Sequence, residues 1–193
     1  MKEAVTFGRY NTFSYAHIST IIAILKQYNN LTIGLIINQQ KNDRDIKEEL
    51  YRIYELADKN YTDKKLLPVG IRKEMMIAGI KQFDLRLLDK VNIEIIRRPE
   101  YFREEFNSKF PKTKYDVIFP RTDDEKNEFD ILRNMYMQEI LGRDIYFVKP
   151  KLTIHNSDME GQREKYMPSD VLRILDEYNK MNSRWKKDYL YAE

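Results

Sequence analysis

The sequence predicts an α/β fold, a doubly wound parallel sheet of five strands with helices on both faces. Strand-like and helix-like segments alternate along the chain, an order typical of parallel sheets connected by helices. In addition, residues 31–37 (LTIGLII) are almost uniformly apolar, as expected for a strand that is covered on both faces. Glycine and proline residues separate the segments and mark their ends.

The first half of the chain contains three predicted strands. Residues 4–7 form a short apolar run that ends at Gly8, and residues 31–37 and 91–96 are the second and third strands. Apolar side chains at helical spacing predict a helix after each of the first two strands, with a further helix over residues 71–80 that is opened by Pro68. The positions are Ile18, Ile21, Ile22, Leu25 and Tyr28 in the first helix, and Ile46, Leu50, Ile53 and Ala57 in the second.

The second half continues the alternation. Residues 115–119 follow Pro111 as the fourth strand, and residues 144–148 form the fifth. Between them a helix is expected to end at Gly142, and a last helix is opened by Pro168. The apolar faces comprise Phe129, Leu132, Tyr136 and Ile140 in the first of these helices, and Val171, Ile174, Leu175 and Tyr178 in the last.

Length and composition favour a single globular domain. The 193 residues suffice for one core, and we expect residues 168–193 to form a helical tail. No apolar run is long enough to span a bilayer and no signal-peptide pattern is visible, while the absence of cysteine excludes disulfides and fits a cytoplasmic protein. The net charge of +3 comes from interleaved charges of both signs, so we expect neither a nucleic-acid partner nor a membrane.

The stretch between the first strand and the first helix is the candidate site. In parallel sheets ligands bind beyond the carboxyl ends of the strands. Gly8 permits a sharp turn and close approach of a ligand, and the helix expected to begin near His17 directs its free amides toward the same place. A phosphate is the natural ligand, and His17 and Ser14 can donate hydrogen bonds to it. The alternative is that His17 is a surface or capping residue and Ser14 a turn or cap residue.

The residues of this stretch, GRYNTFSYAH, resemble the signature G-[RS]-[FY]-x-P-x-[HT]-x-G-H of the HxGH nucleotidyltransferase superfamily. Gly8, Arg9, Tyr10 and His17 match in type and spacing, and Ser14 stands where the family has His or Thr. Thr12 and Ala16 depart from the signature, since they replace the usual Pro and Gly. The resemblance implies that Gly8, Arg9, Tyr10 and Asn11 contact the nucleotide.

Three later segments resemble the same family in the same order. Residues 67–80 (LPVGIRKEMMIAGI) resemble its proline-containing loop and following helix, with Arg72 and Met75 at the Arg and Met positions. Residues 115–125 resemble the fourth strand and its loop, and residues 165–175 resemble the C-terminal helix. The resemblance therefore extends from Val5 to about Tyr178.

The second nucleotide motif of the family, I-S-S-T-x-I-R, is matched poorly. Residues 153–166 read TIHNSDMEGQREKY, in which Ser157 could supply the hydroxyl and Arg163 the guanidinium, with Gly161 opening the turn. His155 lies nearby, either as a further contact or as a loop residue without a task. Arg163 could also be one more solvated charge.

The resemblance implies an in-line transfer without a covalent intermediate. A phosphate of a small acceptor attacks the α-phosphorus of a nucleoside triphosphate, and pyrophosphate leaves, with Mg²⁺ sharing the charge. His17 is expected to stabilise the α-phosphoryl oxygens, and Ser14 and Arg163 to hold the β- and γ-phosphates. Arg72 or Arg121 is expected to bind the acceptor phosphate. Residues 41–65 are either a solvated helix or a lid over the acceptor.

An adenylyltransferase is the leading interpretation, because GRYN resembles the opening of nicotinamide-mononucleotide adenylyltransferases. A cytidylyltransferase acting on a small phosphorylated alcohol, sugar or phosphonate is the second. A nucleotide-binding member that has lost catalysis would explain Thr12, Ala16 and the poor second motif, whereas His17 argues against it. An unrelated doubly wound domain would leave the collinear segments unexplained. The resemblance also allows a homo-oligomer, since association is common in the resembled families.

Overall fold

The structure is a computed structural model that describes residues 2–37, 67–100, 102–121, 136–154, 159 and 161–190, with side chains up to residue 182. The charged segment 41–65, the first half of the helix expected before Gly142, and both His155 and Ser157 lie outside the described residues.

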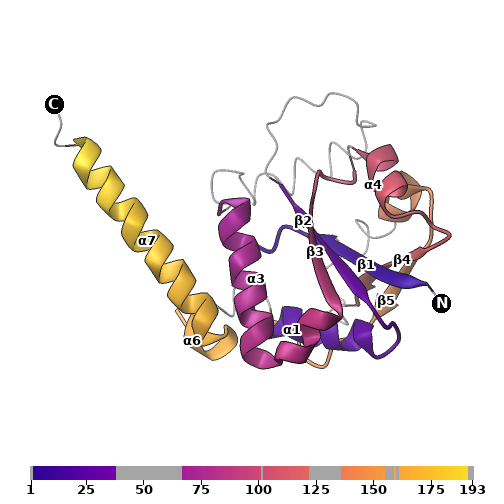
Figure 1. Cartoon of the computed structure of the whole chain (residues 1–193), viewed down its shortest axis with the longest axis horizontal. Helices are drawn as coiled ribbons and strands as arrows, with labels where there is room; N and C mark the ends of the chain where they lie inside the picture. The colour runs from indigo at the N-terminus through magenta and orange to yellow at the C-terminus, as the bar shows by residue number, and fades with distance from the viewer. Residues whose placement is uncertain are drawn as a thin grey trace.

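Five parallel strands form one sheet, which confirms the predicted fold class (Figure 1). The strands are β1 (Glu3–Gly8), β2 (Leu31–Ile36), β3 (Val91–Ile96), β4 (Tyr115–Pro120) and β5 (Ile145–Val148). Their order in the sheet is β3-β2-β1-β4-β5, so the chain moves outward from β1 in one direction and then returns to the other side of β1. This order makes the sheet doubly wound, with its switch point between β1 and β4.

Helices cover both faces of the sheet. One core cluster joins the sheet to α1 (Tyr15–Leu25), α3 (Val69–Phe83) and the start of α7 (Ser169–Leu190). The other cluster joins the opposite face to α4 (Arg103–Lys109) and to a helical turn over residues 136–141. A 3₁₀ turn, η2 (Leu85–Asp89), connects α3 to β3. All six residues of β2 are buried, as its apolar sequence predicts.

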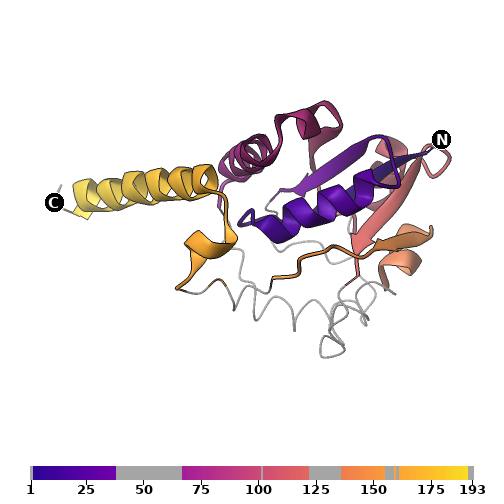
Figure 2. The ribbon, with the colours of Figure 1, turned by 90° about the horizontal axis from the view of Figure 1, so that it is seen from below.

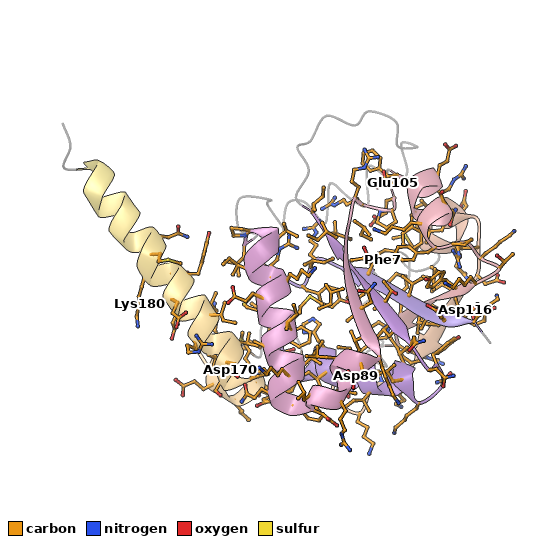
Figure 3. All side chains as sticks on the ribbon, in the orientation of Figure 1. Phe7, Asp89, Glu105, Asp116, Asp170 and Lys180 are labelled. Atoms are coloured by element: carbon orange, nitrogen blue, oxygen red, sulfur yellow. The ribbon has the colours of Figure 1, made fainter. Side chains whose placement is uncertain are left out.

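The second core cluster contains an element that the sequence did not predict. Phe7 of β1 makes edge-to-face contacts with Phe106 of α4 and Phe119 of β4, at ring-centroid distances of 5.1 and 5.0 Å. Phe7 lies in the middle of the molecule, between the sheet and α4 (Figure 3). Phe106 is the only buried residue of the seven-residue α4, and a single apolar side chain gives no periodicity from which to predict a helix.

The helical turn over residues 136–141 ends at Gly142, as predicted, and Gly142 has a φ of +61°. This left-handed conformation is easiest for glycine and ends many helices. The predicted apolar face is wrong by one position, however. The buried side chains are Met137 and Leu141, whereas Tyr136 and Ile140 are only half-buried.

The last helix, α7, packs on α3 only near its start and then leaves the body of the molecule (Figure 1). Val171, Ile174 and Leu175 are buried there, as predicted. The Gln82 side chain of α3 fixes this contact, since it donates to the Ser169 hydroxyl and accepts from the Asp170 N–H. No helix in the described part of the chain is long and apolar enough to cross a membrane.

Candidate functional site

The candidate stretch leaves the sheet at the switch point. β1 pairs with β2 on one side and with β4 on the other. Val5 pairs with Val117. Because the two strands are parallel, Gly8 and Pro120, three residues further along each strand, lie side by side at the carboxyl edge of the sheet. The segment from Gly8 to His17 therefore starts where ligands bind in doubly wound folds, as the sequence predicted.

Gly8 lies in close contact with the ring of Tyr10 in the turn. A Cβ placed on Gly8 would lie 3.1 Å from Cε2 of the Tyr10 ring. Tyr10 has a φ of 45°, a left-handed conformation that is uncommon for a residue with a side chain. The turn is thus formed by a strained Tyr10 whose ring folds back over Gly8. A contact of Gly8 with a nucleotide stays a prediction.

Helix α1 begins at Tyr15, two residues earlier than predicted, with Ser14 as its N-cap and His17 in its first turn. The Ser14 N–H donates a hydrogen bond of 3.0 Å to Nδ1 of His17, and the Ser14 hydroxyl lies 3.0 Å from the same nitrogen. An N–H can only donate, so Nδ1 must be the unprotonated acceptor. In the neutral imidazole the proton is therefore on Nε2, which is left as a hydrogen-bond donor.

The His17 imidazole is kept neutral by its surroundings. Burial lowers its pKa to about 4, because the charged form is disfavoured away from water. The ring of Phe13 stacks on it at a centroid distance of 5.5 Å and an interplanar angle of 15°. The Tyr10 ring lies 5.3 Å away at 59°. At pH 7 the site therefore presents an imidazole N–H of fixed orientation rather than an imidazolium ion.

Ser14 does not have the role that the sequence suggested. Its side chain is 1% exposed and contacts His17, so the hydroxyl is unavailable to a phosphate in this conformation. The alternative interpretation, in which Ser14 caps the helix, is confirmed. Ser14 orients the candidate catalytic group instead of binding the ligand.

Two further residues support His17 and were missed by the sequence analysis. Phe13 is fully buried beneath the His17 ring. A Cβ placed on Gly79 of α3 would lie 2.6 Å from Cδ1 of Phe13 and 3.0 Å from Cγ2 of Val171 on α7. Gly79 therefore lets Phe13 reach its place between α3 and α7. The signal in the sequence was a glycine inside a helix, where it is unfavourable unless close packing requires it.

Arg72 is a structural residue, which corrects the expectation that it binds the acceptor. Its side chain is fully buried. Nε donates to the Leu67 carbonyl at 2.8 Å, and Nη1 donates to the carbonyls of Ile36 at 2.9 Å and of Arg9. The guanidinium thus joins the end of β2, the loop after Gly8 and the start of α3. Because it is enclosed by these groups, it has no surface for an acceptor phosphate.

Arg9 and Asn11 belong to the same corner of the molecule. Burial, and then the nearby charge of Arg9, lower the pKa of the Arg72 guanidinium below its usual value. The two positive charges therefore lie close together at the edge of the sheet. Asn11 accepts a hydrogen bond of 2.7 Å from the Leu67 N–H through its side-chain oxygen, which ties the turn to the start of α3.

The other two predicted arginines lie on the surface. Arg121 directly follows β4, and its N–H donates to the Val148 carbonyl at 2.7 Å, so its exposed side chain starts from the same edge of the sheet as Gly8. Arg163 is the first residue of α6 (Arg163–Tyr166) and is exposed. In both ribbon views α6 lies on the side of the molecule where α1 begins (Figures 1 and 2). Contacts of either arginine with a ligand stay predictions.

No group of three or more His, Asp or Glu side chains that could hold a metal ion occurs among the described residues. The part of the chain that the structure describes therefore does not fit a protein-built metal site.

Comparisons with known proteins agree on the fold. No model of a known protein family matches the chain, and no curated protein matches its sequence. Among solved structures, a protein of Vibrio parahaemolyticus described as a nicotinate-nucleotide adenylyltransferase is 19% identical, with a TM-score of 0.55 over 91% of this chain and 92% of that one. Nicotinic acid mononucleotide adenylyltransferase of Plasmodium falciparum, solved with NaAD, is 13% identical, with a TM-score of 0.53 over 93% and 97% of the two chains.

A third similar structure is a bifunctional NMN adenylyltransferase/ADP ribose pyrophosphatase of Francisella tularensis. It is 16% identical, and the TM-score is 0.57 over the whole of this chain and 58% of that one. The chain thus spans little more than half of the bifunctional protein. This chain has the α/β fold of the solved nucleotide adenylyltransferases. The resemblance expected from the sequence is confirmed at the level of the fold.

Proposed function

We propose that the protein is a nucleotidyltransferase, most simply an adenylyltransferase that moves AMP from ATP to a small phosphorylated acceptor and releases pyrophosphate. The observation that carries the proposal is the neutral, oriented His17 in the first turn of α1, at the switch point of a sheet with this fold. The named solved structures with the same fold are described as adenylyltransferases of nicotinate or nicotinamide nucleotides.

The chemistry requires charge stabilisation rather than a nucleophile from the protein. As the acceptor phosphate attacks the α-phosphorus, negative charge grows on the α-phosphoryl oxygens. The Nε2–H of His17 donates to one of them, and the free amides at the start of α1 add a favourable dipole. Because Ser14 and Phe13 already fix the imidazole, little reorganisation is needed when the charge appears.

Binding of the substrates is assigned to the surrounding arginines. Arg163, with Ser157 from outside the described residues, holds the β- and γ-phosphates, and Arg121 at the end of β4 holds the acceptor phosphate. Arg9, Tyr10 and Asn11 line the nucleotide side through the backbone of the turn. Arg72 acts through Arg9, whose carbonyl it binds.

Mg²⁺ enters the proposal as a partner of the triphosphate. This small cation binds phosphate oxygens and retains several waters, and it often needs few protein ligands. One of the similar structures, the bifunctional enzyme of Francisella tularensis, was solved with AMP and a Mn ion. Since the described residues do not form a metal site of their own, Mg²⁺ would be held mainly by the phosphate oxygens of the substrate.

The test is a panel of ATP, CTP, GTP and UTP against phosphorylated acceptors, beginning with nicotinate and nicotinamide mononucleotides, with pyrophosphate release as the readout. We expect release with ATP and one acceptor, and its loss in His17→Ala. Release with CTP alone would replace the adenylyltransferase by a cytidylyltransferase. Binding of nucleotide without release under any combination would show that catalysis has been lost, and absence of both would overturn the proposal.

A further inference from the structure

A groove of about 450 Å³ lies beside α1 and is lined by residues of that helix from Tyr15 onward. It is bounded by α1, by Phe83 at the end of α3 and by the segment that follows β5. Leu152 in that segment is tied to the helix, since its N–H donates to the Ser19 hydroxyl at 3.0 Å. Figure 2 shows this segment running alongside α1. Volumes of this size are typical of small-molecule sites.

The walls of the groove are apolar and partly open to water. Ile22 and Ala23 line it from α1, and Phe83 and Leu152 line it from α3 and from the segment after β5. Phe83 is 51% exposed and Leu152 is 41% exposed, although both are large hydrophobic side chains. Large apolar groups that stay in water at the edge of a concave surface gain free energy when a ligand covers them.

All charged side chains that line the groove in the described part of the chain are lysines. They are Lys26, Lys149 and Lys151, and no aspartate or glutamate lies among the described lining residues. The chain as a whole has 34 basic and 31 acidic residues, so a one-signed lining is a local departure from its balance. Lys26 and Lys151 are exposed, and neither forms an ion pair with a described residue.

Among the described lining residues of the groove, only Tyr15 belongs to the segment from Gly8 to His17. The lining includes neither His17 nor Gly8, nor Arg9, Arg121 or Arg163. It begins at Tyr15 and Ile18 and extends toward Gln27, hence toward the end of α1 that is remote from the N-cap.

We propose that this groove binds a small organic anion with an apolar body, such as a carboxylate on an alkyl chain or an aromatic ring. Its apolar part would cover Ile22, Phe83 and Leu152, and its carboxylate would lie between Lys26 and Lys151. Apolar area supplies the affinity, and the lysines select against cations of the same shape. The proposal does not depend on the nucleotidyltransferase function.

The experiment is calorimetric titration of the full chain with decanoate, and with decyltrimethylammonium as a cation of similar length. We expect decanoate to bind and the cation to bind at least about tenfold more weakly, because only the anion pairs with lysines. The decanoate titration is repeated with saturating ATP and Mg²⁺, and we expect the same affinity. Displacement by ATP would place decanoate in the nucleotide site and overturn the proposal.

Two variants locate the binding. Lys26→Glu combined with Lys151→Glu should weaken decanoate binding about tenfold or more, while Lys112→Glu, an exposed lysine outside the groove, should not. Ala23→Trp should abolish it by filling the groove. If Ala23→Trp does not fold, the surface charge variants decide alone. Equal affinity in the wild type and the double variant, or no decanoate binding in the wild type, would overturn the proposal. The proposal would also be overturned if the protein is a dimer and Ala23→Trp dissociates it, because a second copy of the chain would then cover the groove.

Discussion

The turn from Gly8 to His17 and the segment from Gly161 to Pro168 are the two stretches expected to hold the triphosphate, and they are built differently. In the first, Phe13 and Ser14 are buried, and the Asn11 side chain is bonded to the start of α3. In the second, Arg163 is exposed on a helix of four residues, and burial begins only at Met167. One stretch is fixed by packing and the other presents a long side chain to solvent.

The difference matches two tasks. A group that stabilises a transition state must already be oriented when charge develops, so its supports are buried and numerous. A group that only binds the ground state can close on its ligand, at the expense of side-chain entropy. On this basis changes in the first stretch should affect turnover, and changes in the second should affect affinity.

The largest effect is expected from His17→Ala. Removal of one preorganised donor lowers kcat by about 10²–10³, which corresponds to roughly 3–4 kcal/mol, while KM changes little. Steady-state kinetics with ATP and the acceptor found in the panel measure both. The control is Thr20→Ala, which removes a side-chain hydrogen bond to Ala16 one turn further along α1 and should leave kcat near the wild-type value. Turnover in His17→Ala within threefold of the wild type would mean that His17 and the turn from Gly8 to His17 have only a structural role.

The second effect is on stability and depends on pH. The folded pKa of His17 is about 4, below the value of about 6.5 for an unfolded histidine. The unfolded state therefore binds more protons between these values, so this group leaves stability unaffected above pH 6.5 and reduces it as the pH falls toward 4. The loss approaches about 3 kcal/mol.

Urea unfolding of the wild type and of His17→Gln, at several pH values from 7.5 to 4.5, isolates this contribution. As the pH falls, the unfolding free energy of the wild type should decrease relative to that of His17→Gln, because glutamine does not titrate. Parallel pH profiles of the two proteins would show that the pKa of His17 is not lowered in the folded state, and the contrast between the two stretches would lose its basis.

A smaller effect is expected from Gly79→Ala, which tests the packing beneath His17. The new Cβ would lie 2.6 Å from Phe13, and overpacking of this kind costs about 1–3 kcal/mol of stability. Gly70→Ala in the same helix is the control, because nothing lies within 4 Å of its added Cβ. The control should be neutral or slightly stabilised, since alanine favours helices.

A double variant tests whether the position of Phe13 affects catalysis. Displacement of Phe13 by Gly79→Ala should lower kcat more than it raises KM, and Gly79→Ala with Phe13→Leu should recover part of both stability and kcat by giving the methyl group room. Loss of stability with kcat unchanged would mean that Phe13 supports the fold but not the orientation of His17.

The smallest effect is expected from Arg163→Lys. Lysine keeps the charge but loses the paired, planar donors, so ATP should bind about 1 kcal/mol more weakly, or roughly fivefold. Calorimetry with Mg²⁺ measures this, and thermal unfolding without ligand should be unchanged because the side chain is exposed. Arg173→Lys, an exposed surface position on α7, serves as the control. Unchanged ATP affinity in Arg163→Lys would remove the second stretch from the site.

The strands, α3 and the packed face of α7 could be predicted because each carries several apolar residues at a regular spacing. A short helix such as α4, with Phe106 alone in the core, leaves no such pattern. The face of residues 136–141 was misplaced by one position because the tyrosine and isoleucine there are as apolar as the Met137 and Leu141 that are buried.

In the site, the position of Gly8 and His17 could be predicted from their place between strand and helix. The roles of Ser14 and Arg72 could not, because each depends on a partner that sequence spacing does not identify. The Ser14 hydroxyl lies against His17, and the Arg72 guanidinium binds three carbonyls that are distant in the chain. A polar residue type shows that hydrogen bonds will form, whereas only the fold shows whether the partner is protein or ligand.

The central place of β1 in the sheet has a consequence for biosynthesis. Residue 3 is synthesised long before residue 115, its partner in β4. Until that strand has been made, β1 exposes an unpaired edge to which another nascent chain could add. The turn after Gly8 also gains its full support late, because Phe13 and Val171 both lie close to Gly79. Nascent chains that end before residue 115 should therefore need protection from aggregation, and those that end before Val171 should lack part of the packing around Phe13.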